Sequence, residues 1–224
     1  MKRSFIIKYT IFTLLAVVSM SSTVFAKENT VADKTNKEMQ QIIDKSKHDS
    51  NELIKNWDKL KVTATPKTSK EINSINSVDS EAAPNSVGSV GDILVTPATV
   101  FGNGPITGHA GMVDLNPDLT IESMTSGGVR RYTNDWKTRY TKALCATVKN
   151  ADPEQAVDYA SSKIGCSYNY NFLNKWKTDT FYCSQLVWRA YIEQGIDLDK
   201  DGGNAVLPTD LVSDKIDINW RSNY

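Results

Sequence analysis

Cys183 begins an apolar helical segment, within the stretch Phe-Tyr-Cys-Ser-Gln-Leu-Val-Trp at residues 181–188. The predicted helix runs from about Tyr182 to Gln194, with Gly195 as its C-terminal stop. Apolar side chains follow the cysteine on the same helical face: Leu186, Val187, Ala190 and Tyr191. Unpaired backbone N–H groups in the first turn of a helix favour a thiolate, and they can also hold an oxyanion. This position predicts a nucleophilic cysteine that attacks a carbonyl group.

A nucleophilic cysteine needs a general base, and the chain has two histidines. His48 lies in a polar N-terminal segment, where we expect a solvated surface role. His109 begins a predicted strand, and imidazole is the commonest general base because its pKa lies near neutrality. Glu122 lies on the predicted return strand, and a turn at residues 116–118 sets positions 109 and 122 close to opposite each other. We therefore expect Glu122 to orient His109, and His109 to serve Cys183.

Each of these residues also has a purely structural interpretation. A half-buried cysteine in a helix is usually a small hydrophobic side chain, and a lone histidine in a strand is more often a satisfied core residue. The three residues taken together, with the helix start and the hairpin, favour the catalytic interpretation.

Strands and helices must bring these residues together. The sequence predicts strands over residues 93–95, 109–113, 119–124 and 143–148, and Gly127-Gly128 is expected to end the hairpin. The predicted fold class is α+β, with an antiparallel sheet packed against helices.

A second helix has clear signals at both ends. Asp152 is the expected N-cap, Pro153 takes the first helical position, and Gln155 stands where a capping box requires it. Gly165 is expected to end this helix. Its apolar stripe is predicted to be Ala156, Tyr159, Ala160 and Ile164.

The N-terminal part of the chain differs from the rest. Residues 1–26 begin with basic residues, continue with an apolar run and end in Val-Phe-Ala, which predicts a signal peptide cleaved after Ala26. A membrane anchor is the alternative. Residues 27–89 form a polar leader, either a tether or one with an amphipathic helix, that ends in a linker. Residues 90–224 are the predicted catalytic domain, and the protein is expected to be secreted or associated with the cell wall.

Charge and hydropathy argue against a nucleic-acid-binding protein and against a transmembrane helix beyond the signal. Cleavage after Ala26 removes three basic and no acidic residues, which leaves 23 basic against 26 acidic side chains. No basic patch is dense enough to indicate nucleic acid. Beyond the signal, no apolar run approaches the ~18 residues of a transmembrane helix.

The chain has three cysteines, Cys145, Cys166 and Cys183. An odd number in an exported protein leaves at least one thiol unpaired, and Cys183 is the natural candidate. A disulfide between Cys145 and Cys166 stays open at this point.

One stretch resembles a metal site. Residues 197–202, Asp-Leu-Asp-Lys-Asp-Gly, match the opening of a calcium loop, but Pro208 stands where the twelfth position requires a glutamate. We therefore expect an acidic turn and no bound metal there. Two histidines and scattered thiols make a zinc site improbable, and the Gly-x-Ser-x-Gly motif of a serine hydrolase is absent.

Four segments carry a resemblance to a known family. They are Gly91-Asp-Ile-Leu94, Gly108-His-Ala-Gly-Met-Val113, Ile121-Glu122 and Phe181-Tyr-Cys-Ser-Gln-Leu-Val187. In this order they resemble the circularly permuted NlpC-type papain-fold hydrolases, the YiiX/YycO-like group, which is related to lecithin:retinol acyltransferase. In the ordinary NlpC-type order the cysteine helix comes first, whereas here the histidine strand precedes it. The resemblance covers residues 88–215 and implies a circularly permuted papain-like fold.

The resemblance also implies roles for individual residues. Cys183 would be the nucleophile, His109 the base, and Glu122 the residue that orients His109. Tyr168 matches a tyrosine near the nucleophile, and its hydroxyl is expected to help to hold the oxyanion.

The residues that flank the cysteine are further candidates. We expect Tyr182 and Ser184 to contact the oxyanion or the substrate. Tyr182 stands where the ordinary family often has aspartate, and Gln185 where it has glycine. Both are expected to line the approach to the thiol, so a specificity inherited from cell-wall endopeptidases stays open.

The predicted function is that of an exported cysteine hydrolase that cleaves an amide bond through an acyl-enzyme without a cofactor. Export and the resemblance point to peptidoglycan peptides, within the wider class of peptides and acylated small molecules. Two alternatives remain. One is an acyltransferase, or a lipid-amide or ester hydrolase, on the same fold, which product analysis with added acceptors would separate. The other is a non-catalytic binding module, whose biological activity would survive the loss of Cys183.

Overall fold

The computed structural model describes residues 32–63, 85–98 and 105–223. The chain divides into two compact units, Met1–Gln41 and Ile42–Tyr224. In the first unit the described residues, 32–41, are helical. Two predictions lie wholly or largely outside the described residues: the signal peptide, and the linker that ends the polar leader, of which residues 64–84 are not described. In the described part of the chain, no helix is long and apolar enough to cross a membrane.

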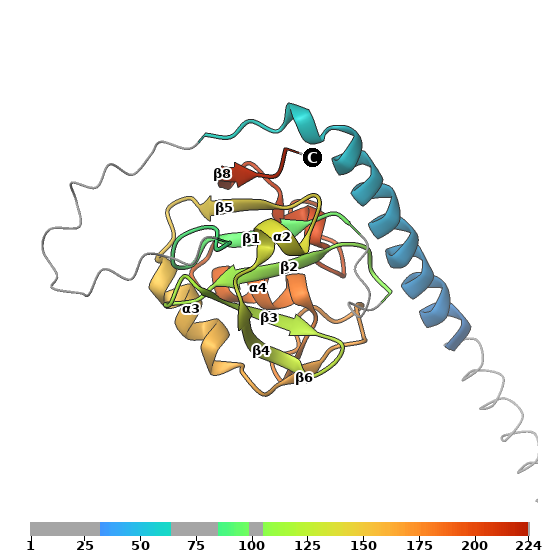
Figure 1. The fold of residues 1–224 in the computed structure, drawn as a ribbon. Helices are drawn as coiled ribbons and strands as arrows, with labels where there is room; N and C mark the ends of the chain where they lie inside the picture. Colours follow the sequence, from blue (N-terminus) through green and yellow to red (C-terminus); the bar gives the residue numbers. More distant parts are fainter. Residues whose placement is uncertain (1–31, 64–84, 99–104, 224) are drawn as a thin grey trace, which may run out of the picture. The chain divides into compact units, whose positions relative to one another are not determined.

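The second unit is built on a six-stranded sheet in the order β4-β3-β2-β1-β5-β8, and every neighbouring pair is antiparallel (Figure 1). The strands are β1 (Ile93–Thr96), β2 (His109–Val113), β3 (Leu119–Met124), β4 (Gly128–Thr133), β5 (Leu144–Val148) and β8 (Ile216–Arg221). Two further short strands, β6 (Ser167–Tyr168) and β7 (Thr180–Phe181), pair in parallel outside this sheet.

Two helices cover one face of the sheet, behind it in Figure 1. They are α3 (Pro153–Ser162) and α4 (Cys183–Ile192). The other described helical segments of this unit are residues 42–55, η1 (Trp57–Lys59), α2 (Trp136–Arg139) and η2 (Pro208–Leu211). This arrangement confirms the α+β class and the antiparallel sheet.

Alternation along the strands builds two cores. Ile93 and Val95 of β1 face the helices and join the larger core with Leu186 and Val187 of α4. Leu94, between them, points to the opposite face, into a smaller core. That core also holds Val87, Val113, Trp136, Tyr140, Ala143 and Cys145. Because α2 covers this second face, both faces of the central strands are buried.

The glycine pair after β3 was misread. Gly128 begins β4 instead of ending the hairpin, and the sheet continues by one more strand. A Cβ at this position would lie 2.0 Å from the carbonyl oxygen of Cys166, and Gly128 has a φ of 65°. The glycine is therefore required by close contact with the segment after α3. Strand β8 was missed as well.

The N-cap and the proline at the start of α3 are confirmed, with Asp152 accepting hydrogen bonds from the N–H groups of Glu154 and Gln155. The capping box is not formed, because the N–H of Asp152 donates to Oε1 of Gln194 and not to Gln155. Gly165, with a φ of 93°, lies in the turn that follows the helix. The predicted stripe is partly wrong, because Val157 is fully buried while Ile164 is 38% exposed. Ile164 lies in the turn beyond the helix, where the chain has left the buried face.

The three cysteines are free thiols, so the disulfide left open by the sequence is not formed. Cys145 is buried on β5, with Sγ 3.6 Å from a carboxylate oxygen of Asp92. Cys166 lies in the segment after α3 that contacts Gly128. The thiol of Cys145 therefore contacts Asp92 and not Cys166.

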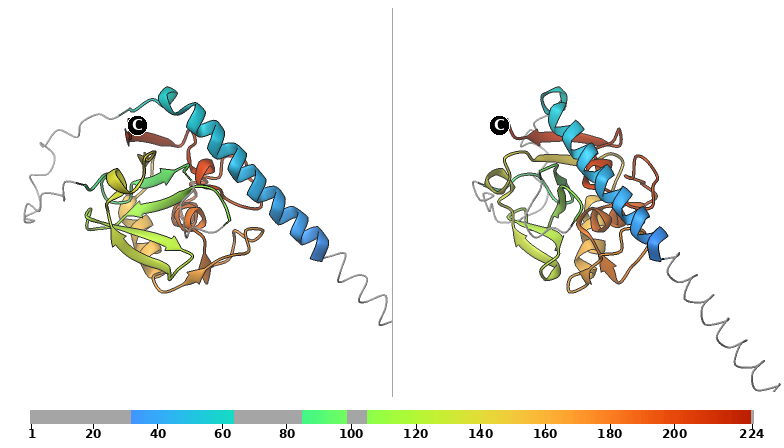
Figure 2. Two further views of the ribbon diagram at one scale, coloured as in Figure 1. Left: turned by 45° about the vertical axis from the view of Figure 1, so that its right-hand side comes forward. Right: turned by 90° about the vertical axis from the view of Figure 1, so that its right-hand side faces the viewer.

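The segment before residue 64 is anchored to the sheet. The Nε1 of Trp57 donates to the carbonyl of Ser222 at 2.9 Å, and its side chain is 1% exposed. The N–H of Thr63 donates to Ile218 of β8 at 2.8 Å, and the end of the helix lies beside β8 in all views (Figures 1 and 2). Residues 42–63 accordingly belong to the same compact unit as the sheet. The domain boundaries expected from the sequence stay predictions.

We expect Trp57→Ala to lower the free energy of unfolding by about 3–5 kcal/mol, because it leaves a cavity and removes a buried hydrogen bond. Urea unfolding followed by far-UV circular dichroism measures this. Ile54→Ala, at a side chain that is 36% exposed on the helical segment before η1, should cost less than about 1 kcal/mol. Equal effects of the two substitutions would show that this segment is not anchored through Trp57.

Candidate active site

Cys183 occupies the first position of α4, directly after the N-cap Tyr182. Burial raises the pKa of its thiol, but His109 and the backbone N–H groups of Ala110 and Ser184 outweigh burial. The net pKa is therefore lower than that of an ordinary cysteine. His109 is the largest of the causes that lower this pKa, and the start of α4 contributes through the N–H of Ser184.

His109 lies fully buried at the start of β2. Its Nε2 is 2.6 Å from a carboxylate oxygen of Glu122, and its ring stacks on Trp136 at 5.7 Å between centroids. Since Nε2 is occupied by Glu122, Nδ1 is the nitrogen that remains for Cys183. Burial lowers the pKa of His109, but Cys183 and Glu122 raise it further, to about 9. The site therefore favours an imidazolium beside a thiolate.

Glu122, on β3, is fixed by three side chains besides the histidine. The Nη1 of Arg139 lies 3.0 and 2.9 Å from its two oxygens, and the Nε1 of Trp136 donates to it at 3.0 Å. The hydroxyl of Thr120 donates at 2.5 Å. Burial raises the pKa of Glu122, but His109, Arg139 and Thr120 lower it to about 2. Glu122 thus stays anionic across the physiological range and holds the histidine ring in one orientation.

Sequence reasoning missed Arg139 and Trp136, which both lie on the single turn α2. Arg139 is itself fixed by Asp135 at 2.6 Å and by the carbonyl of Thr133 at 2.8 Å. A tryptophan and an arginine three residues apart after a strand give a weak signal, because α2 is too short for helical periodicity to identify it. Their roles become visible only in the folded site.

Tyr168, on β6, is near the cysteine. Burial raises the pKa of its hydroxyl, and the charge of Cys183 raises it further. Its ring packs against Tyr170 at 4.9 Å between centroids, and Tyr170 is 59% exposed. The hydroxyl of Tyr168 therefore stays protonated and can donate a hydrogen bond. Tyr170, which packs on its ring, lies at the protein surface.

The two residues that flank the cysteine face the protein interior. The hydroxyl of Tyr182 accepts from the N–H of Val206 at 2.9 Å, and its ring packs edge-on against Phe172. Ser184 Oγ donates to the carbonyl of Val206 at 2.7 Å. Both side chains are completely buried. They attach residue 206 to the start of α4, and what Ser184 presents to the sulfur is its backbone N–H.

Gln185 does not line the approach to the thiol, contrary to expectation, because its side chain is fully buried. Its Oε1 accepts from the N–H of Tyr182 at 3.1 Å and from Asn169 at 3.0 Å. Its Nε2 donates to the carbonyls of Lys175 and Lys177. The amide thus caps α4 and braces the preceding loop, which a glycine at this position could not do.

Two comparisons with known proteins fit this geometry. The sequence model of the family described as "Permuted papain-like amidase enzyme, YaeF/YiiX, C92 family" matches residues 98–207, the stretch that holds Cys183, His109 and Glu122. This match supports a YiiX/YycO-like permuted papain-like family for residues 98–207. This family consists of papain-like cysteine amidases, and the histidine strand precedes the cysteine helix here, as permutation requires.

A curated relative supports this assignment. The chain is 35% identical over 112 residues to the uncharacterized protein YycO of Bacillus subtilis (strain 168). The alignment covers 47% of this chain and 45% of YycO, so the chain spans less than half the length of that relative. The shared part is therefore similar to the YiiX/YycO-like group.

Proposed function

We propose that the protein is an exported cysteine hydrolase that cleaves an amide bond with Cys183 as nucleophile, His109 as general acid–base and Glu122 as the residue that orients His109. The observation that carries this proposal is the buried His109, whose Nε2 lies 2.6 Å from a Glu122 oxygen and whose charge lowers the pKa of the Cys183 thiol. The amidase family of residues 98–207 supports the reaction class.

The proposed reaction begins with the thiolate and the imidazolium already formed. The sulfur attacks the carbonyl carbon, and the new oxyanion is held by N–H groups of the first turn of α4, with Tyr168 as a further donor. The imidazolium of His109 gives its proton to the leaving amine as the C–N bond breaks, which leaves a thioester on Cys183. His109 then takes a proton from a water molecule as the water oxygen attacks the carbonyl carbon of the thioester. The C–S bond breaks, which releases the carboxylic acid and restores the thiolate of Cys183.

We also propose export and a cell-wall substrate. The basic start, apolar run and Val-Phe-Ala ending of residues 1–26 support cleavage after Ala26. The NlpC-type features of the sequence support peptidoglycan peptides as the substrate class.

An acyltransferase or lipid-amide hydrolase is the second candidate. Its support is the pair of exposed aromatic residues in this region, Tyr170 at 59% and Trp176 at 58%, which offer surface for an acyl chain. Incubation of an acylated substrate with and without an added primary amine separates the two: a hydrolase releases the free acid in both, and a transferase forms the new amide.

The test of the proposed site is the alkylation rate of Cys183 by iodoacetamide as a function of pH, followed by peptide mapping. An ordinary thiol has a pKa near 8.5. Since His109 lowers the pKa of Cys183, we expect rapid alkylation well below pH 8.5 in the unmodified chain and a shift to higher pH in His109→Ala. A normal titration, or an inert thiol, in both proteins would exclude the thiol-hydrolase mechanism and favour the binding module.

A further inference from the structure

Three acidic side chains outside the active site have the spacing of metal ligands. Asp199, Asp201 and Asp210 each offer a carboxylate oxygen, and these oxygens all lie within 4.8 Å of one another. Calcium binds oxygens at about 2.3–2.6 Å, so two ligands of one ion lie at most about 5 Å apart. The spacing of the three oxygens therefore fits a shared calcium ion.

Unsatisfied oxygens gather at the same place. Among the described residues, Asp199 Oδ1, Asp210 Oδ1 and Thr209 Oγ1 are buried without a hydrogen-bond partner. The side chains of Asp199 and Asp210 have no exposed surface. A buried acceptor without a donor is costly, and a cation satisfies it. This observation is independent of the clustering and points to a positively charged ligand.

The loop also provides the ligand that the sequence seemed to lack. Pro208 occupies the twelfth position counted from Asp197, but Asp210 follows two residues later on η2. Its Oδ2 accepts from the N–H of Leu207 at 2.7 Å, which fixes the carboxylate. Asp197 Oδ1, by contrast, accepts from Trp188 and from the N–H of Asp199. The carboxylates that gather here therefore differ from the ligand set of the calcium loop whose opening residues 197–202 match.

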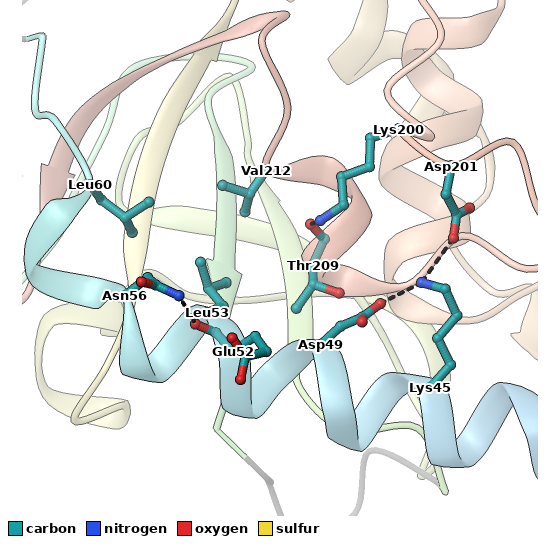
Figure 3. A pocket seen from close by; sticks show the side chains of 10 residues that line it. All are labelled: Lys45, Asp49, Glu52, Leu53, Asn56, Leu60, Lys200, Asp201, Thr209 and Val212. Carbon is teal, nitrogen blue, oxygen red and sulfur yellow. Dashed lines mark hydrogen bonds and ion pairs between the residues drawn. The ribbon is translucent and has the colours of Figure 1, made fainter.

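A lysine now serves as the cation of this cluster. The Nζ of Lys45 lies 2.8 Å from Asp201 Oδ2, and it also pairs with Asp49 (Figure 3). The same Nζ lies 3.7 Å from Asp210 Oδ1. Lys45 and Asp201 line a pocket of 480 Å³ between residues 45–60 and the loop after α4. Lys45 is therefore well placed to be displaced by an ion that enters from this pocket.

We propose that Asp199, Asp201 and Asp210 form a divalent-cation site suited to Ca²⁺, and that the ion and the ammonium group of Lys45 exclude each other. The ligands are all oxygens without an imidazole or thiol, which suits Ca²⁺ better than Zn²⁺. Lys175 occupies the other oxygen of Asp199, at 2.5 Å, and leaves Oδ1 for the ion. Calcium would thereby release the helix over residues 42–55 from its ion pair with Asp201.

The first test is calorimetric titration of the full chain with CaCl₂. We expect Lys45→Met to bind Ca²⁺ at least ~10-fold more tightly than the unmodified chain, since a competing charge is removed. Asp210→Asn should weaken binding at least ~10-fold. Asp179→Asn, at a side chain that is 75% exposed, makes the same change of charge outside the cluster and should leave affinity unchanged. Absence of binding in both the unmodified chain and Lys45→Met, or equal effects of the two asparagine substitutions, would overturn the proposal.

The second test needs no substitution. Acetylation of lysines followed by peptide mass mapping should modify Lys45 faster with Ca²⁺ than without it, while Lys55, whose side chain is 73% exposed, serves as reference. An unchanged Lys45-to-Lys55 ratio at saturating Ca²⁺ would contradict the exclusion. Neither readout involves catalysis, so this proposal can fail or stand independently of the proposed hydrolase.

Discussion

Replacing Cys183 with serine is expected to lower the rate of enzyme acylation by at least ~10³-fold, because a hydroxyl stays protonated where the thiol is ionised. The natural substrate is not needed for this measurement. p-Nitrophenyl acetate transfers its acetyl group to the nucleophile and releases coloured p-nitrophenolate in a burst. Mass mapping then shows whether the acetyl group resides on residue 183.

The matched control is Cys166→Ser, at a partly exposed free thiol outside the site. It should leave the burst unchanged. Acetylation that persists on another residue in Cys183→Ser, with an unaltered burst, would remove Cys183 from the reaction. A burst lost equally in both variants would point to a general effect on folding, which circular dichroism detects.

Glu122→Gln is expected to lower the acylation rate by about 10²–10⁴-fold while the protein stays folded. The amide can no longer stabilise a positive charge on His109, and it leaves the guanidinium of Arg139 without its carboxylate. Both effects act on the buried ion pair. The same p-nitrophenyl acetate burst, recorded from pH 5 to 10, measures the loss.

The dependence of the acylation rate on pH should also change in Glu122→Gln, in a direction that the pKa shifts determine. In the unmodified protein the rate rises as Cys183 ionises below the ordinary thiol pKa and falls as His109 loses its proton near pH 9. Without the carboxylate, the pKa of His109 drops, so the falling limb moves to lower pH. The rising limb moves to higher pH, because the thiolate loses its cation. The profile should become both lower and narrower.

Asp114→Asn is the control for a buried carboxylate. Asp114 is 2% exposed and pairs with Arg131 at 2.5 Å, outside the active site. Its substitution should lower stability without changing the shape of the pH profile. If the pH profile of Glu122→Gln were the same as that of the unmodified protein, Glu122 would not set the protonation of His109.

Local patterns predicted the elements that position the site. The strands around His109 and Glu122 and the helix at Cys183 follow from alternation, a turn and apolar spacing, and the structure has them within a few residues. The Nε2 of His109 is consequently within 2.6 Å of Glu122. The role of Gly128 was misread because a glycine is required there by its close contact with Cys166. Cys166 lies far along the chain, so no local sequence pattern contains this contact.

The supporting residues could not be predicted in the same way. Gln185 looks like a substrate contact in the sequence because it lies beside the nucleophile, yet a helix directs neighbouring side chains to different faces, and this one is buried. Arg139 and Trp136 act on Glu122 from a single turn that has no periodicity. Long-range polar contacts of this kind depend on how strands and turns are stacked, which residue types alone leave undetermined.

Cys183 has a relative exposure of 1% although it is the proposed nucleophile. A thiol with so little exposed surface should react faster with small electrophiles than with bulky ones. A slender electrophile such as iodoacetamide should outpace a bulky maleimide by a wider margin at Cys183 than at the half-buried Cys166. The same enclosure is expected to shield the thiolate from large oxidised thiols such as glutathione disulfide.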